Sequence, residues 1–254
     1  MCGIVGYVGK RPALGILLEG LTRLEVRGSD SAGVVVQNGH GLTSEKVPGK
    51  VEVLRARIAD RPFHGGSGLG HARRATHGGV NRANAHPHFS CDGKIAVVHN
   101  GSVENYAELR RELRDHRFTS TTDTEVIPHL IEERYERLGR DLLRSVMLTL
   151  KKIRGSFAIG VMTAHQPGLL VAGRVHCPLA VGLGSGENFL ASDLSALLPH
   201  TRRVVPLEGR EIVEIDGTGM QLFDSDLRPQ SREPLEVTWK NGRILQRGYR
   251  RSSG

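Results

Sequence analysis

Cys2 and the Asn100-Gly101 pair are the residues of this chain whose types could combine into one reaction. Removal of Met1 would leave the thiol of Cys2 beside its own free α-amine. A free thiol has a pKa of about 8.5 and an α-amine a pKa of about 7.7–8.0, so the amine can accept the thiol proton at little cost. Asn100 and Gly101 offer a side-chain amide and a backbone N–H to a developing oxyanion. Together these groups predict attack of a thiolate on an amide carbon.

Each of these residues also has a simpler interpretation on its own. A small second residue permits removal of Met1 without implying any function for Cys2. An isolated Asn-Gly dipeptide at the end of an apolar run is usually an ordinary turn. The reaction is therefore predicted from the combination of residues and not from either motif alone.

Two further segments carry groups suited to a charged substrate. Arg73 offers a guanidinium for bidentate binding of a carboxylate, and Thr76 and His77 add a hydroxyl and an imidazole on the same loop. The alternative for this loop is a basic surface segment. Asp123 either caps the helix that follows it or presents its carboxylate to a substrate ammonium group.

His86 and His88, with Cys91 nearby, raise the question of a zinc site. Their spacing lacks the paired C-x-x-C or H-x-x-x-H pattern of such sites. We therefore expect no metal and no other cofactor. Hydrogen-bonded structural histidines, and packed or inert thiols at Cys91 and Cys177, are the preferred interpretation.

Apolar periodicity predicts the elements that must position these residues. Helices are expected over residues 13–24, 51–58, 105–114, 123–138, 142–152 and 192–198. Strands are expected over residues 4–8, 33–36, 68–71, 95–99, 157–161, 169–171, 179–181, 204–205 and 211–215. The strand at 95–99 is expected to stop at an Asn100-Gly101 turn. Strands, then helices, then strands again indicate an α+β fold rather than alternating βαβ units.

Composition and charge narrow the class of protein. The 254 residues suffice for one large domain with a substantial core. The net charge is +8, but the basic residues alternate with acidic ones, and six Phe and four Tyr are never clustered. A nucleic-acid partner is therefore not expected.

The chain shows no sign of a membrane or secretory route. No apolar run approaches the length of a membrane helix, and no secretory signal is expected at the amino terminus. Three scattered cysteines indicate a reducing compartment, so we expect a cytoplasmic protein. One domain is expected over residues 2–235, followed by a basic polar tail over residues 236–254.

The ordered set of motifs resembles the glutaminase domain of glucosamine-6-phosphate synthase, a class II glutamine amidotransferase. The resemblance covers nearly the whole chain. It rests on residues 1–7, 24–33, 71–78, 84–88, 98–106, 122–127 and 184–193.

The resemblance implies an amino-terminal-nucleophile (Ntn) hydrolase fold, four layers in αββα order with two stacked antiparallel sheets. It implies that Cys2 attacks the side-chain amide of L-glutamine and forms a thioester. Asn100 and Gly101 match the oxyanion hole of the family, and Asp123 matches the residue that holds the substrate α-ammonium. The family's carboxylate-binding arginine corresponds to Arg73, with Thr76 and His77 on the same loop; Arg27 matches an arginine close to the nucleophile.

Three departures from the family pattern are seen, two of them in the surroundings of the site. Arg74 stands where the family has a Trp associated with an ammonia channel, and Val26 and Ser29 replace two tyrosines. The family continues into two sugar-isomerase domains that this chain does not include, so either a truncated chain or a separate synthase partner is expected. Two alternatives therefore stay open: an amidotransferase for another acceptor, or an impaired remnant that binds glutamine or a partner.

Overall fold

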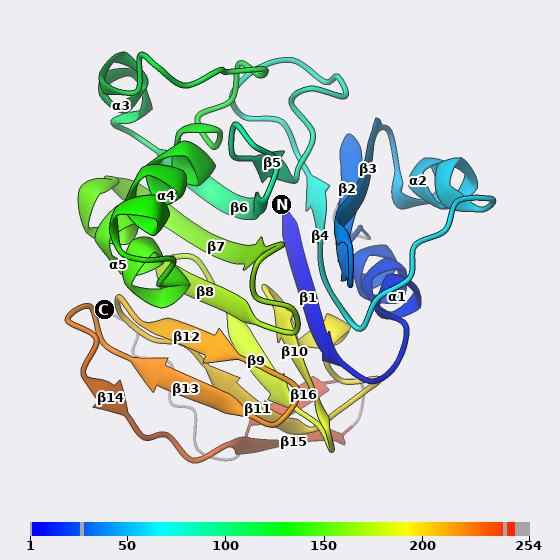
Figure 1. Cartoon of the computed structure of the whole chain (residues 1–254). Helices are drawn as coiled ribbons and strands as arrows, with labels where there is room; N and C mark the ends of the chain where they lie inside the picture. The colour runs from blue at the N-terminus through cyan, green and yellow to red at the C-terminus, as the bar shows by residue number, and fades with distance from the viewer. Residues whose placement is uncertain (1, 26–27, 241–242, 247–254) are drawn as a thin grey trace.

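Two antiparallel sheets lie face to face, and helices cover the outer face of each (Figure 1). This computed structural model describes residues 2–25, 28–240 and 243–246. The layers follow the order helix, sheet, sheet, helix. The four-layer αββα arrangement expected from the sequence is thereby confirmed.

The first sheet has nine strands, with β1 near its middle. In spatial order the strands are β16 (Arg243–Gln246), β15 (Leu235–Lys240), β11 (Arg203–Pro206), β9 (Ala180–Leu183), β10 (Glu187–Ala191), β1 (Gly3–Gly9), β4 (Ser67–Arg73), β2 (Ser31–Asn38) and β3 (Gly41–Pro48). The register of β1 with β4 sets Gly3 opposite Ala72 and Ile4 opposite His71. The start of β1 therefore lies beside the end of β4.

The second sheet has seven strands. In spatial order they are β14 (Pro229–Gln230), β13 (Met220–Phe223), β12 (Ile212–Ile215), β8 (Leu170–Val175), β7 (Gly155–Thr163), β6 (Ile95–Val103) and β5 (His88–Phe89). The helices are α1 (Ala13–Glu25), α2 (Val51–Ile58), α3 (Tyr106–Glu112), α4 (Val126–Arg137) and α5 (Leu142–Lys152), with a short 3-10 helix, η1 (Leu194–Ala196). None of the helices in the described ranges combines the length and apolar character needed to span a bilayer.

Three apolar cores hold the four layers together. The first joins α1 and α2 to the outer face of the nine-stranded sheet, and the second joins α4 and α5 to the outer face of the other sheet. The third lies between the sheets. Period-two alternation explains how one strand serves two cores, since Val5 and Tyr7 of β1 belong to the first core and Ile4 and Val8 to the third.

The same alternation places the predicted functional residues. Cys2 has the parity of Ile4, which faces the other sheet. His71 and Arg73 share the parity of Leu69 in β4, another member of the core between the sheets. Asn100 shares the parity of Ala96 and Val98 in β6. Three strands from two sheets thus bring their functional side chains to the space between the sheets.

The predicted turn at Asn100-Gly101 is wrong, because β6 continues through both residues to Val103 and pairs with β7 along this length. Gly101 adopts φ +111°, a conformation that side chains disfavour, and a Cβ there would overlap the carbonyl oxygen of Ser156. The glycine therefore permits a distortion within the strand instead of ending it.

Two further differences from expectation concern Asp123 and the last strands. α4 begins at Val126 rather than at residue 123, so Asp123 is not its N-cap. Residues 236–240 and 243–246 do not form the expected polar tail: β15 pairs with β11 and with β16 in the nine-stranded sheet, and Val237 is buried. Alternation of polar and apolar residues around Val237 lets one face of β15 join the first core. Residues 247–254 lie outside the described residues.

Candidate active site

Cys2 lies immediately before β1, against the end of β4. Its Sγ accepts a hydrogen bond from the backbone N–H of Arg74 at 3.2 Å and lies 3.4 Å from the Arg74 carbonyl oxygen. Burial raises the pKa of the Cys2 thiol, while the Arg74 N–H and the nearby charge of Arg73 lower it in part. The thiol therefore stays protonated near neutral pH until a base takes its proton.

The side chain of Asn100 is held between Cys2 and His71. Its Nδ2 donates to the carbonyl oxygen of Cys2 at 3.3 Å, and its Oδ1 lies 2.9 Å from Nε2 of His71. An amide oxygen only accepts, so the Nε2 of His71 carries the proton. Burial lowers the pKa of His71 to about 3, which keeps this ring neutral. His71 therefore orients the amide donor of Asn100 toward Cys2.

Arg73 presents a buried guanidinium with a free donor. Arg73 is only 5% exposed. Nη2 donates to the carbonyl oxygen of His77, and Nη1 has no hydrogen-bond partner among the described residues. A buried N–H without a partner is costly, so a ligand oxygen that accepts from Nη1 would be stabilised.

Asp123 is buried beside the same loop. Its Oδ2 accepts the backbone N–H of Val103 at 2.7 Å, and its Oδ1 lies 4.0 Å from Nδ1 of His77. Asp123 is 4% exposed. Thr76, in contrast, is exposed on the loop between Arg73 and His77. Of the two alternatives open for Asp123, helix capping is excluded, and the carboxylate remains available to a cation.

The contacts close a ring at one end of the space between the sheets. Backbone contacts of Arg74 connect Cys2 to the loop of Arg73, and His77 connects that loop to Asp123. Val103 connects Asp123 to the strand of Asn100, whose amide returns to Cys2. A thiol, a side-chain amide donor, a guanidinium donor and a carboxylate thus lie around this ring. This combination suits an α-amino acid with a carbonyl in its side chain.

Asp30 is a site residue to which the sequence analysis assigned no role. Its Oδ2 accepts the N–H of Ala75 at 2.8 Å, and its own N–H donates to the carbonyl oxygen of Arg73 at 2.9 Å. Asp30 therefore fixes both sides of the turn that carries Arg74. An isolated carboxylate just after Gly28, where a helix gives way to a strand, was the available signal.

His86 and His88 do not form a cluster with Cys91. The ring of His86 stacks on His71 at 4.1 Å, and its Nδ1 accepts the N–H of His99 at 3.1 Å. Nε2 of His88 lies 3.2 Å from the hydroxyl of Thr122. Both rings thus lie beneath the candidate site as structural, hydrogen-bonded groups. Cys91 lies instead beside His116, 3.3 Å from its Nδ1.

The departures from the family pattern lie next to the ring of contacts. The side chain of Arg74 is exposed, although its backbone contacts Cys2. The hydroxyl of Ser29 donates to Glu25 at 2.5 Å, at the end of α1. Val26 and Arg27 lie outside the described residues.

A family model described as a glutamine amidotransferase domain matches residues 56–221 of this chain. The chain belongs to the glutamine amidotransferase family. Arg73, Asn100 and Asp123 lie within the matched residues, and Cys2 lies before them.

Curated relatives extend the similarity of this amidotransferase domain to nearly its full length. The glutamine–fructose-6-phosphate aminotransferase (isomerizing) of Thermus thermophilus is 50% identical over 242 residues, 94% of this chain and 39% of the relative. The enzyme of the same name from Clostridium perfringens is 47% identical over 98% of this chain and 41% of the relative. The chain thus spans about two fifths of the length of these relatives.

Solved structures support the same fold. Glutamine phosphoribosylpyrophosphate amidotransferase from B. subtilis superposes with a TM-score of 0.75 at 26% identity, over 90% of this chain and 50% of that one. The amidotransferase domain therefore has the Ntn hydrolase fold that the resemblance implied.

Proposed function

We propose that this amidotransferase domain hydrolyses the side-chain amide of L-glutamine to L-glutamate and ammonia, with Cys2 as nucleophile. The convergence of four groups supports this proposal most directly. The thiol of Cys2 and the amide of Asn100 would contact the reacting carbonyl, while Arg73 and Asp123 would bind the α-carboxylate and α-ammonium groups.

The first chemical step forms a thioester. Once Met1 is removed, the α-amine of Cys2 takes the thiol proton, and the thiolate attacks the amide carbon of glutamine. The Nδ2 of Asn100 and the N–H of Gly101 donate to the oxygen that becomes negative. The C–N bond then breaks, the α-ammonium returns its proton to the leaving nitrogen, and ammonia departs.

The second step regenerates the thiol. Water attacks the thioester carbon and gives its proton to the α-amine, and the same two donors stabilise the second oxyanion. The C–S bond breaks, glutamate leaves, and the sulfur recovers a proton. His77 and Thr76 would line the substrate subsite without taking part in proton transfer.

We further propose that the ammonia serves an amino-sugar synthesis from fructose 6-phosphate. The two relatives named for this activity are 47–50% identical to the chain, against 26% for the phosphoribosyl-directed enzyme. The glutaminase unit would extend from residue 2 through β15, which belongs to the nine-stranded sheet. The acceptor would bind a sugar-isomerase part, either in a longer chain or in a partner. A cytoplasmic location would keep the Cys2 thiol reduced.

The experiment compares glutamate release by the unchanged chain, by Cys2→Ala and by Cys177→Ala. Loss of release in Cys2→Ala alone is expected, because only this variant lacks the nucleophile. The Cys177→Ala control removes a different thiol and should keep its activity. Equal turnover by Cys2→Ala and the unchanged chain would eliminate the proposal.

The same assay separates the remaining alternatives. Binding of glutamine by the unchanged chain without turnover would favour a remnant that only binds. Glutamate release that a sugar-isomerase partner does not stimulate, but another acceptor enzyme does, would retain the glutaminase and reject the sugar acceptor.

A further inference from the structure

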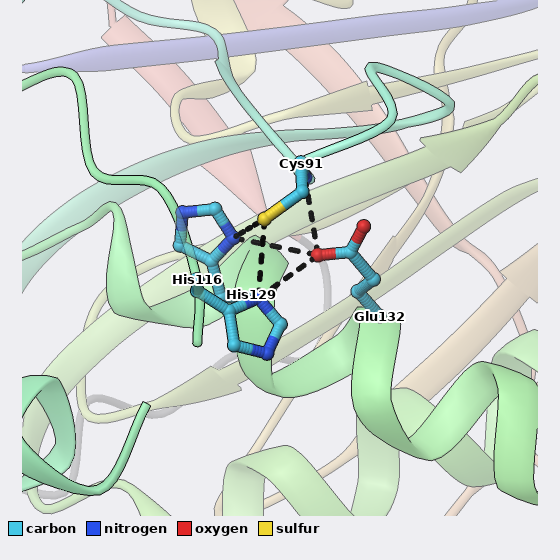
Figure 2. Close-up of side chains that lie close together, drawn as sticks. All are labelled: Cys91, His116, His129 and Glu132. Carbon is cyan, nitrogen blue, oxygen red and sulfur yellow. Dashed lines mark hydrogen bonds and ion pairs between the residues drawn. The ribbon is translucent and has the colours of Figure 1, made fainter. Parts of the chain in front are cut away.

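A second group of reactive side chains lies away from the candidate active site, on the helix side of the seven-stranded sheet. Cys91 lies in the turn between β5 and β6, and His116 lies in the loop between α3 and α4. His129 and Glu132 lie one helical turn apart on α4. Figure 2 shows the four side chains pointing toward one another.

The four donor atoms form a compact polyhedron. Sγ of Cys91 lies 3.3 Å from Nδ1 of His116 and 3.5 Å from Nδ1 of His129. Oε2 of Glu132 lies 3.1 Å and 3.5 Å from the same two nitrogens. All four atoms lie within 4.8 Å of one another. Tetrahedral zinc, with bonds of about 2.0–2.3 Å, requires donor atoms roughly 3.3–3.6 Å apart, which is close to this arrangement.

The surrounding groups prepare these side chains for a cation. The carboxylate of Glu132 accepts the backbone N–H groups of Cys91 and Asp92 at 3.1 and 3.3 Å. The N–H of Arg117 donates to Sγ of Cys91 at 3.5 Å. These contacts hold the carboxylate of Glu132 and the sulfur of Cys91 in position beside the two imidazoles.

Both imidazoles face the cluster with their Nδ1 atoms. Nε2 of His116 lies 3.6 Å from a carboxylate oxygen of Glu133, an arrangement that orients metal-binding histidines. His129 is buried, and its ring packs edge-on against Phe118 at 4.7 Å. Its Nε2 has no hydrogen-bond partner in the described part of the chain, so the polar contacts of this ring are made through Nδ1.

We propose that Cys91, His116, His129 and Glu132 bind one Zn²⁺ ion in tetrahedral coordination. A thiolate with two imidazoles and a carboxylate suits zinc, whereas Ca²⁺ and Mg²⁺ prefer oxygen ligands. Four protein ligands leave no open position, so the ion is structural rather than catalytic. The sequence did not predict this site because its ligands come from three segments without paired spacing.

The position of the site gives the ion a role in the glutaminase, and this part of the inference rests on the proposed function. The segment between His116 and His129 carries Asp123, the proposed partner of the substrate ammonium group. An ion bound at both ends of this segment would fix it against the turn that carries Cys91. Removal of the ion should therefore raise KM for glutamine more than it lowers kcat.

The test uses Co²⁺ as a spectroscopic substitute for Zn²⁺ in the Cys2→Ala chain, because a free amino-terminal cysteine would itself chelate metal. After treatment with a chelator, addition of Co²⁺ should give a 1:1 complex with the visible bands of tetrahedral cobalt and a near-ultraviolet thiolate charge-transfer band. Cys91→Ser should abolish the charge-transfer band. Cys177→Ser, which removes the other remaining thiol, should leave the spectrum unchanged.

Two measurements keep the test independent of whether a variant folds. Native mass spectrometry of the Cys2→Ala chain should show one Zn²⁺ per molecule, and Zn²⁺ should raise its Tm by several degrees. In variants that retain the far-ultraviolet spectrum of the fold, His129→Gln should weaken zinc affinity at least tenfold.

Specific outcomes would overturn the site. Octahedral cobalt bands, an unchanged spectrum in Cys91→Ser, or no bound Zn²⁺ in the mass spectrum would each contradict it. One equivalent of zinc bound to the Cys2→Ala chain, together with no glutamate release by the unchanged chain, would support the site and reject the proposed function. An unchanged KM after zinc removal from an active chain would reject the link to Asp123.

Discussion

The side-chain amide of Asn100 is held from two sides, which fixes the direction in which it donates. His71 donates to its oxygen, and its NH₂ group donates to the carbonyl oxygen of Cys2. Because an oxyanion forms only in the reaction, Asn100→Ala should lower kcat for glutamine about 10²–10³-fold, roughly 2.7–4 kcal/mol, with little change in KM. Steady-state glutamate release measures both constants.

A distant amide provides the control for that variant. Asn38 donates to Thr43 in the hairpin between β2 and β3, so Asn38→Ala should leave kcat unchanged. An Asn100→Ala chain that keeps its kcat and shows only a raised KM would assign Asn100 to ground-state binding instead.

The charge of Asp123 should matter only for a substrate with an amino group. Asp123→Asn should raise KM for glutamine about tenfold or more, because a buried carboxylate no longer faces the α-ammonium. Glutaramate, which is glutamine without its amino group, should react poorly but equally with both chains. A KM for glutamine that is the same in both chains would remove Asp123 from the substrate subsite.

Local motifs predicted the residues that are proposed to meet substrate, since Cys2, Arg73, Asn100 and Asp123 each lie in a short recognisable run. His71 was not predicted as a positioning residue. Its role depends on the contact between β4 and β6, which belong to different sheets and whose relation no local spacing reveals.

Two glycines of α1 should respond to alanine in opposite directions. Gly15 is exposed with no atom near an added Cβ, so Gly15→Ala should stabilise the fold by about 0.5–1 kcal/mol through helix propensity. At Gly20 an added Cβ would lie 2.9 Å from Cγ1 of Val5, so Gly20→Ala should destabilise by about 1–3 kcal/mol.

Urea unfolding of the two variants measures both effects, and each variant is the control for the other. Stabilisation by both substitutions would show that β1 and α1 pack less tightly than the structure indicates. Destabilisation by both would show that Gly15 has a contact that the structure does not contain.

Element prediction succeeded where burial is one-sided or complete. α1 and α5 were predicted nearly to the residue, because one face of each is apolar. β3 was not predicted, since most of its side chains are only half-buried at the edge of a sheet. The Asn100-Gly101 pair was misassigned because its local preference for a turn is overcome by pairing of β6 with β7.

Four buried histidines link the candidate site to the stability of the whole molecule. They are His71, His86, His88 and His99. Burial lowers the pKa of His71 to about 3 and of His99 to about 4, and lowers the pKa of the other two well below the ordinary value. In the unfolded chain all four would titrate near pH 6.5.

The contribution of these histidines to the free energy of unfolding should therefore be greatest above about pH 6.5 and decrease as the pH falls below it. Between the two pKa values the unfolded chain binds protons that the folded chain does not, which costs roughly 1.4 kcal/mol per pH unit and histidine at most. Urea unfolding at constant ionic strength between about pH 7 and pH 5, with a chelator present, measures the slope.

In this pH range the histidines titrate and the carboxylates do not. Against the opposing effect of burial, hydrogen bonds from His129 and Cys91 lower the pKa of Glu132 to about 2, so its contribution to the free energy of unfolding is lost only below the ordinary carboxylate pKa of about 4.3. His88→Gln removes one of the four rings. It should reduce the slope of the free energy of unfolding against pH by the equivalent of up to one bound proton. A free energy of unfolding that stays constant from about pH 7 to pH 5 would contradict burial of neutral histidines beneath the site.

The most direct test of the account is the intact mass of the protein after reaction with an electrophilic glutamine analogue. We expect a chain that lacks Met1 and carries one adduct, which peptide mapping assigns to Cys2 at the new amino terminus. A chain that retains Met1 and still hydrolyses glutamine, or an adduct on Cys91 or Cys177 that stops the reaction, would contradict it.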